Sequence, residues 1–245
     1  MKMCFRILKN MFLLILVVCV CSGFVVAGKG YAVYREVVEE TGLEEKVAAV
    51  RAKESYTEYE DLPRVYVQAV IAVEDKRFEG HMGVDLIALC RAVKNDIRAG
   101  AFVEGGSTIT QQLARNLYFE QDKDLTRKVA EMLVAMDLER NYTKEEIFEL
   151  YVNAIYFGDG YYDVASASRG YFGKEPEDMT EYESTLLAGI PNAPSVYAPT
   201  KNPDLAVKRQ LKVLERMEAC GYLSTEEAET VAETAVGALA VVHQP

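Results

Sequence analysis

Apolar residues recur every three or four positions along most of this chain, and the strict alternation that marks a half-buried strand is scarce. Four segments open with a Ser or Thr that is followed three residues later by Glu or Gln, which is the spacing of an N-terminal capping box: Thr108, Thr143, Thr180 and Ser224. Glycine or proline then marks the expected helix ends. We predict helices near residues 84–99, 124–140, 144–156, 164–172, 181–189 and 203–219. The pattern therefore predicts an all-α fold.

The N-terminal segment has a different pattern. Lys2, Arg6 and Lys9 precede an apolar run over residues 11–28, which at about 1.5 Å per residue is long enough to cross a roughly 30 Å hydrocarbon layer. Basic residues before the run and acidic residues after it place the N-terminus in the cytoplasm and the body outside. We predict a basic cytoplasmic tail over residues 1–10 and a transmembrane signal anchor over residues 11–28.

Two other interpretations of this segment are open. A cleaved signal peptide is the alternative, because Val-Val-Ala at residues 25–27 is a tolerable small-residue cleavage site. A lipoprotein is less favoured, because Val18 and Val20 precede Cys19 and Cys21 where a small residue is expected.

The rest of the chain reads as one domain with short appendages. Residues 29–60 are polar and acidic with scattered Val and Tyr, and we expect a stalk and a first helix there. A single globular domain is expected over residues 61–236, followed by a C-terminal tail over residues 237–245. Neither an internal repeat nor an interdomain linker is visible in the sequence.

Charge and cysteine usage exclude several classes of protein. The 245 residues carry a formal net charge of −11, and because residues 1–27 hold three cations and no acid, the remainder stands at −14. An acidic body argues against nucleic-acid binding, which needs a basic surface. The five cysteines and two histidines have no spacing of a zinc site or disulfide framework. Cys90 and Cys220 either pair or remain buried free thiols.

The first candidate for chemistry lies where an apolar helix gives way to a glycine-containing loop. Glu74 and Asp75 arrive at that junction, and burial against the apolar face would raise a carboxyl pKa and make it a plausible base near neutral pH. The alternative is a solvated cluster of charges.

The second candidate is a glycine loop that opens onto a helix at residues 105–116. Thr108, Gln111, Gln112 and Arg115 lie within about a turn of one another and combine hydroxyl, amide and guanidinium donors suited to a diphosphate or to sugar hydroxyls. The alternative is an ordinary capped helix with a polar outer face.

The third candidate lies on the helix expected over residues 124–140, which is apolar nearly all round beyond Glu131. Arg127 and Lys128 stack over that carboxylate, and an exposed ion pair is the alternative interpretation. Two carboxylates from separate helices beside clustered cations suggest glycosyl or phosphoryl chemistry. A nucleophilic hydrolase is poorly supported, because the body proper holds only His81 and no G-x-S-x-G motif.

Taken together, these segments resemble the family 51 glycosyltransferases, which comprise the glycosyltransferase domain of class A penicillin-binding proteins and the monofunctional transglycosylases. The resemblance spans roughly residues 62–215 and consists of five motifs in order. They are EDKRFEGHMGVD from residue 74, GGSTITQQLARN from 105, RKVAE from 127, KEEIFELYVNAIYFGDG from 144 and LLAGIPNAPSVYAP from 186.

The resemblance implies a lysozyme-like all-α fold with two lobes flanking a cleft, the smaller lobe contacting the membrane. It also implies polymerisation of lipid II, in which the 4-hydroxyl of an incoming GlcNAc attacks C1 of the growing chain's MurNAc and undecaprenyl diphosphate leaves. The partners implied are lipid II, the lipid-linked glycan, the membrane and other cell-wall synthesis proteins. A divalent cation, Mg²⁺ or Mn²⁺, is expected to share the diphosphate charge, with its ligands unknown and no organic cofactor.

The family's roles carry over to the matching positions. Glu74 resembles the base that deprotonates the acceptor hydroxyl, and Glu131 resembles a second essential carboxylate near the donor, consistent with a single inversion. The remaining matches are expected to bind substrate or stabilise the departing diphosphate: Asp75, Phe78, His81, Ser107, Thr108, Gln111, Gln112, Arg115, Asn116, Arg127 and Lys128.

Some positions depart from the family pattern. Arg115 stands where lysine is more common, which keeps the charge and changes the contact geometry. Asp163 replaces a glycine, so that loop is expected to differ, and the segment Glu-Ser-Thr at residues 183–185 replaces Glu-Ala-Ala.

The absence of a serine transpeptidase domain before Pro245 leads us to expect a monofunctional enzyme. A muramidase or lytic transglycosylase with the same fold is the alternative enzyme. A catalytically weak membrane-anchored scaffold is the alternative outside enzymology.

Overall fold

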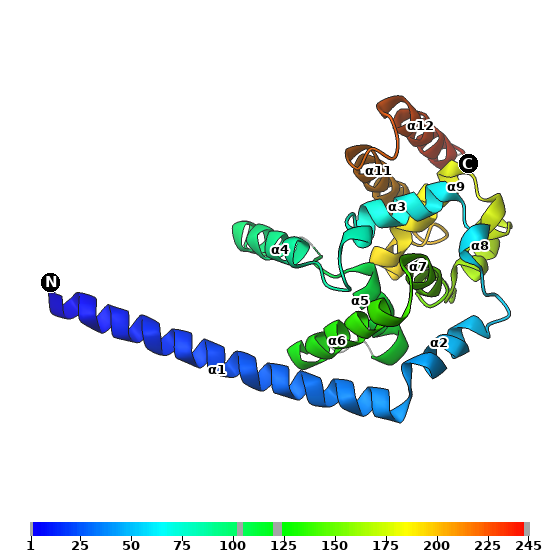
Figure 1. Ribbon diagram of the computed structural model, residues 1–245. Coiled ribbons are helices and arrows are strands. Elements are labelled where there is room, and N and C mark those ends of the chain that lie inside the picture. Colours follow the sequence, from blue (N-terminus) through cyan, green and yellow to red (C-terminus); the bar gives the residue numbers. More distant parts are fainter. Residues whose placement is uncertain (1, 102–104, 120–123, 243–245) are drawn as a thin grey trace.

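The computed structural model describes residues 2–101, 105–119 and 124–242, and within them every regular element is a helix (Figure 1). The predicted all-α fold is therefore confirmed. The α-helices are α1 (Lys2–Glu40), α2 (Leu43–Arg51), α3 (Arg64–Glu74), α4 (Leu86–Ala99), α5 (Ile109–Tyr118), α6 (Leu125–Asn141), α7 (Lys144–Val152), α8 (Val164–Phe172), α9 (Glu181–Gly189), α10 (Pro194–Tyr197), α11 (Pro203–Ala219) and α12 (Thr225–Val242). Short 3₁₀ turns are η1 (Tyr59–Asp61), η2 (Phe78–Gly80), η3 (Pro176–Asp178) and η4 (Ile190–Asn192).

Local capping sets most helix starts. Thr108, Thr143 and Thr180 each form the predicted capping box at the start of α5, α7 and α9. Ser224 exchanges the same bonds with Glu227 ahead of α12. Helices α8, α9 and α11 match the predicted ranges, whereas α7 stops at Val152, short of the predicted residue 156.

The core lies where α3 meets two helices from the C-terminal part of the chain. Helix α3 packs against α9 and α11, while α5 packs against α6 and α7. The largest fully buried side chains are aromatic, and each contributes about 2–3 kcal/mol through removal of apolar surface from water. These aromatics are Tyr66, Phe78, Phe148, Tyr151 and Phe157. The packing fixes the end of α3 against α5 and α11, and that end carries Glu74.

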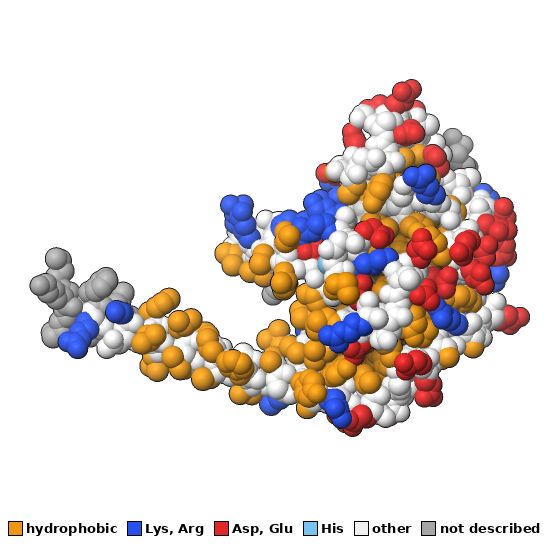
Figure 2. Space-filling view, in the orientation of Figure 1, with side chains coloured by type: hydrophobic (Ala, Val, Ile, Leu, Met, Phe, Trp, Pro, Cys, Tyr) orange, Lys and Arg blue, Asp and Glu red, His pale blue; other side chains and the backbone are white. Residues whose placement is uncertain are grey.

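Helix α4 stands away from this body (Figure 1) and buries only Ala92. Asp85 caps its first turn by accepting bonds from the amides of Ile87 and Ala88. Its large apolar side chains remain exposed, and Figure 2 shows apolar side chains on the side of α4 turned toward α1. These residues are Leu86, Ile87, Val93 and Ile97. An uncovered apolar face of this kind marks an interaction surface.

The N-terminal segment forms one long helix. Within the described part of the chain, Lys9–Glu40 is the one stretch that is long and apolar enough to cross a membrane. In the segment over residues 29–60, where we expected a stalk and a first helix, α1 continues unbroken to Glu40 and its last third packs along α6. Helix α2 then buries Leu43 and Val47 in the core.

Two smaller expectations also change. The C-terminal segment expected as a tail from residue 237 is helical to Val242, and residues 243–245 lie outside the described residues. Cys90 and Cys220 are both free, but the thiol of Cys90 is exposed and that of Cys220 is half-buried. The expectation of two buried thiols is therefore wrong.

Candidate active site

Glu74 ends α3 at the wall of a cavity of about 410 Å³. Its carboxylate accepts a 2.8 Å hydrogen bond from the amide of Gln112 and lies 3.5 Å from the guanidinium of Arg209. Burial raises the pKa of Glu74, an effect that the Gln112 bond and the nearby arginines only partly offset. The sequence-based expectation of a buried carboxylate at this junction agrees with this geometry.

The same cavity gathers basic side chains from three helices and one loop. Arg115 comes from α5 and Arg91 from α4, while Lys76 follows Glu74 directly. Helix α11 contributes Arg209, Lys212 and Arg216, which sequence reasoning missed. Their spacing of three and four residues places them on one helix face and was the available signal. Six cations around one carboxylate make this a local cationic cleft in an acidic protein.

A second cavity of about 440 Å³ adjoins the first. Gln112, Arg115, Pro191 and Asn192 line both cavities, so they lie at the boundary between the two. Asn116 and Arg127 add polar groups to the wall of this second cavity. Much of the rest of its wall is formed by apolar and aromatic side chains, namely Phe119, Ile155, Tyr156, Pro194 and Val196. An apolar wall with a few polar groups suits a sugar or peptide attached to an anionic group.

Glu131 is 1% exposed on α6 and is held by two cations. Arg127 donates to one of its oxygens, and Lys128 donates to the other at 3.0 Å. Lys128 also donates to the hydroxyl of Ser107 at 2.8 Å, which ties α6 to the glycine loop. Burial, with the charges of Arg115 and Arg127, lowers the pKa of Lys128 to about 8. The predicted pairs exist, but they are buried rather than solvated.

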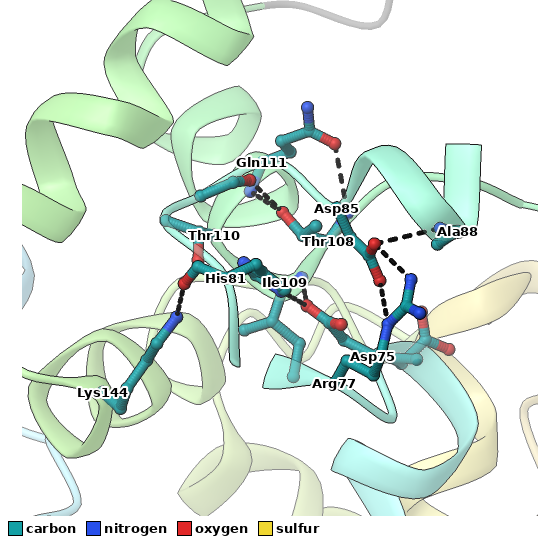
Figure 3. Close-up of polar contacts among 12 residues, drawn as sticks. Asp75, Arg77, His81, Asp85, Ala88, Thr108, Ile109, Thr110, Gln111 and Lys144 are labelled. Atoms are coloured by element: carbon teal, nitrogen blue, oxygen red, sulfur yellow. Dashed lines mark hydrogen bonds and ion pairs between the residues drawn. The ribbon is translucent and has the colours of Figure 1, made fainter. Parts of the chain in front are cut away.

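Several residues that were expected to bind substrate are buried and bonded to neighbouring segments of the chain (Figure 3). The carboxylate of Asp75 accepts the amide of Ile109 at 3.1 Å and lies 2.8 Å from Nε2 of His81. Thr108 caps α5 and donates to the carbonyl of Gly83.

Phe78 and Gln111 are 1% and 2% exposed, and the side chain of Gln111 accepts the amide of Thr108. Neither residue lines the two cavities described above, and Nε2 of Gln111 is buried without a hydrogen-bond partner. Their direct contact with substrate stays a prediction. They join the end of α3 to the start of α5.

Asp163 has a structural reason for its departure from the family pattern. Its carboxylate caps α8 by accepting the amide of Ser166 at 2.7 Å and the hydroxyl of Ser55 at 2.9 Å. Thr185, in the second departure, donates to backbone carbonyls of α9 and accepts the amide of Gln210 at 2.9 Å. Both side chains make hydrogen bonds that hold helices together, and neither lines the two cavities.

The donor set does not fit a metal held by protein ligands alone. Among the described residues, no group of three His, Cys, Asp or Glu side chains lies close enough to hold a metal ion. Glu131 is engaged by two cations, and Glu74 has Gln112 and Arg209 beside it. No step of the chemistry below is therefore assigned to a divalent cation.

Comparison with known proteins agrees with this geometry. A family model described as Transglycosylase matches residues 42–218. Penicillin-binding protein 1F of Bacillus subtilis is 46% identical over 177 residues, covering 72% of this chain and 25% of that protein. Penicillin-binding protein 1A of Aquifex aeolicus is 42% identical and covers 72% of this chain and 24% of its own length.

The chain thus spans about a quarter of the length of these curated relatives. A crystal structure of penicillin-binding protein 1A from Haemophilus influenzae matches 51% of this chain and 15% of its own, at 29% identity and a TM-score of 0.35. Because the family model covers well over half of the residues, the chain belongs to the transglycosylase family, the family 51 glycosyltransferases.

Proposed function

We propose that this protein is a peptidoglycan glycosyltransferase that polymerises lipid II into glycan strands and releases undecaprenyl diphosphate. The observation that carries the proposal is the carboxylate of Glu74, whose side chain is only 9% exposed, on the wall of a cavity lined by six cations. A base and a polyanion site are the two things that this reaction requires in one place. Family membership supplies the substrate class.

Glu74 is the proposed general base. The 4-hydroxyl of the acceptor GlcNAc gives its proton to the Glu74 carboxylate as its oxygen forms a bond to C1 of the donor MurNAc. The bond from C1 to the diphosphate breaks, and its electron pair leaves with undecaprenyl diphosphate. The raised pKa of Glu74 brings its basicity closer to working pH, and Gln112 orients the carboxylate at 2.8 Å.

The two cavities supply places for two lipid-linked diphosphates. Arg115 and Arg127 line the second cavity, and we assign them, with Lys128 beside them, to the diphosphate that leaves the donor. Arg209, Lys212 and Arg216 line the Glu74 cavity, and we assign them to the diphosphate of the acceptor. Glu131 holds two of these cations in place, so it acts as a positioning residue rather than a nucleophile. A single displacement then inverts the α-linked donor into a β-glycosidic bond.

The protein is proposed to work as a single-pass membrane enzyme, with α1 as anchor and the body on the extracytoplasmic face. The apolar face of α4 would meet the membrane surface, and other cell-wall synthesis proteins would be its partners. A divalent cation, Mg²⁺ or Mn²⁺, would enter with the substrate, since its ligands would have to include diphosphate oxygens.

The test is polymerisation of purified lipid II by the full chain in liposomes, followed by gel separation of glycan products. Glu74→Gln should lose at least about a thousandfold in turnover and keep its melting temperature, because the amide cannot accept the acceptor proton. Glu79→Gln, at an exposed carboxylate on η2, is the matched control and should match the unmodified chain.

Other outcomes would select other functions. Near-normal turnover by Glu74→Gln would refute its role as base. Cleavage of preformed glycan would indicate a muramidase or lytic transglycosylase, and binding of lipid II without turnover would indicate a scaffold. The expectation that the protein lacks transpeptidase activity stays a prediction, which labelling with a fluorescent penicillin tests.

A further inference from the structure

The last third of α1 lies along α6 and runs in the same direction. Gly30 contacts α6 at Thr126 and Val129, and four residues later the hydroxyl of Tyr34 donates a hydrogen bond to Asp137. The buried and half-buried positions of α1 follow a helical stripe, whereas Lys29 and Tyr31 are exposed. From Gly30 onward, the stripe consists of Gly30, Val33, Tyr34, Val37 and Val38. Helix α1 therefore packs against the body through this stripe, in addition to carrying the apolar segment that we propose as the anchor.

Gly30 is the point of closest approach between the two helices. A Cβ atom at this position would lie 2.5 Å from Cβ of Val129 and 2.9 Å from the carbonyl oxygen of Thr126. Both are closer than non-bonded atoms can pack, and neither belongs to the end of a flexible side chain. Any larger residue at position 30 must therefore push α1 away from α6. A Cβ atom added at Gly28, about half a turn earlier, would have no other atom within 4 Å.

The docked face of α6 is opposite the face that serves the cleft. At about 100° per residue, Thr126, Val129 and Asp137 share one side of the helix. Arg127, Lys128 and Glu131 point roughly the other way, toward Ser107 and the second cavity. Displacement of α6 by α1 would therefore move these three side chains without touching them.

The contact also lies just past the end of the apolar run that could cross a membrane. The apolar run ends at residue 28, and Gly30 lies about 3 Å further along the helix axis at about 1.5 Å per residue. The turn of α6 that carries Arg127 and Lys128 is level with Gly30. A lipid-linked diphosphate sits at this level, because its hydrocarbon tail stays in the bilayer and its charges stay in water.

We propose that α1 is a positioning element for the reaction, and that its contacts through Gly30 and Tyr34 hold the diphosphate-binding residues of α6 at the level of the membrane surface. The inference rests on the proposed function for the identity of the substrate. It adds that the anchor sets the geometry of the donor site as well as tethering the enzyme. Gly30 and Tyr34 act through Arg127 and Lys128 and contact no reacting atom.

The experiment uses the full chain in liposomes with a single tryptophan as a depth reporter. The sequence contains no tryptophan, and Leu125, the first residue of α6, is 73% exposed, so Leu125→Trp gives one signal beside the donor cations. Phospholipids brominated at known acyl positions report its depth by quenching. Gly30→Val is compared with Gly28→Val in this background, and Tyr34→Phe is a milder variant that removes only the bond to Asp137.

We expect Gly30→Val to shift the quenching profile and to lower kcat/KM on full-length lipid II by about tenfold to a hundredfold, the scale of a roughly 1 Å misplacement. With a short-chain lipid II analogue dispersed in water, the loss should be much smaller, because membrane height no longer matters. Tyr34→Phe should cost roughly two- to tenfold, the range for one lost hydrogen bond. Gly28→Val should match the parent chain in every measurement.

Three results would overturn the inference. An unchanged depth and rate for Gly30→Val would show that the contact positions nothing. Equal losses on the bilayer and water-dispersed substrates would reduce it to a folding contact, and a changed depth with an unchanged rate would remove its link to catalysis. A parent chain that turns over no lipid II would refute the proposed function instead. The quenching profile is read without turnover and separates that failure from the others.

Discussion

At the scale of single residues, the two acidic side chains of the site differ in what surrounds them. Glu74 accepts one amide at 2.8 Å and has the Arg209 guanidinium at 3.5 Å, and these contacts offset only part of the cost of burying its charge. Glu131 is buried beside two cations that each contact one of its carboxylate oxygens, so its negative charge is compensated. The sequence motifs predicted that both matter. The environments separate a proton acceptor from a positioning residue.

This difference predicts opposite effects on stability. Glu131→Gln leaves Arg127 and Lys128 without their anion and should lower the free energy of unfolding by about 2–3 kcal/mol, somewhat less than a fully buried pair because Lys128 is 31% exposed. Glu74→Gln should leave stability unchanged or raise it, since the raised pKa means that its charge is costly to bury. Urea unfolding of the two variants measures this, and equal destabilisation would contradict the assigned roles.

The pKa values also predict the pH dependence of kcat/KM. Activity should fall on the acid side as Glu74 gains a proton, at a pH above the ordinary range of a carboxyl group. On the alkaline side it should fall above about pH 8 as Lys128 loses its charge and diphosphate binding weakens. Lys128→Arg should flatten the alkaline limb, because arginine stays charged. Lys94→Arg on the exposed side of α4 is the control, and an unmoved alkaline limb in Lys128→Arg would assign it to another group.

At the scale of helices, the sequence predicted what local interactions decide. Capping boxes and terminal glycines involve neighbours in the chain, so Thr108, Thr143 and Thr180 were readable without tertiary information. The continuation of α1 to Glu40 was missed because exposed charged residues such as Arg35 and Glu36 interrupt the apolar stripe and because its partner α6 lies about a hundred residues away. The cations of α11 were missed for the same reason, since only packing of α11 on α3 brings Arg209 to Glu74.

Two capping residues allow a matched test of how α5 serves the site. Thr108→Ala and Thr143→Ala each remove the same box and should each lower the free energy of unfolding by about 1–2 kcal/mol. Only α5 carries Gln112 and Arg115, so only Thr108→Ala should also reduce turnover well below the melting temperature. Melting curves and initial rates of both variants check this. Equal rates in the two variants would show that the cap of α5 is structural only.

At the scale of the whole molecule, the protein is acidic overall but concentrates basic side chains in one cavity. The chain is at −11 overall, yet Lys76, Arg91, Arg115, Arg209, Lys212 and Arg216 line one cavity. Composition alone could predict that an anionic substrate needs such a pocket, but not where it lies, because its members come from segments more than a hundred residues apart. The acidic remainder would repel anionic polymers and leaves this cleft as the attractive surface.

The same arrangement predicts how the protein responds to loss of divalent cations. Because the described residues contain no cluster of three metal ligands, EDTA should leave the melting temperature of the substrate-free protein unchanged. Polymerisation of lipid II should fall in EDTA and recover with Mg²⁺ or Mn²⁺, since the cation would arrive as a partner of the substrate diphosphate. A lower melting temperature in EDTA would indicate a resident metal, which the side chains around Glu74 and Glu131 do not favour. Turnover that is insensitive to EDTA would instead mean that the arginines and lysines of the two cavities neutralise the leaving diphosphate by themselves.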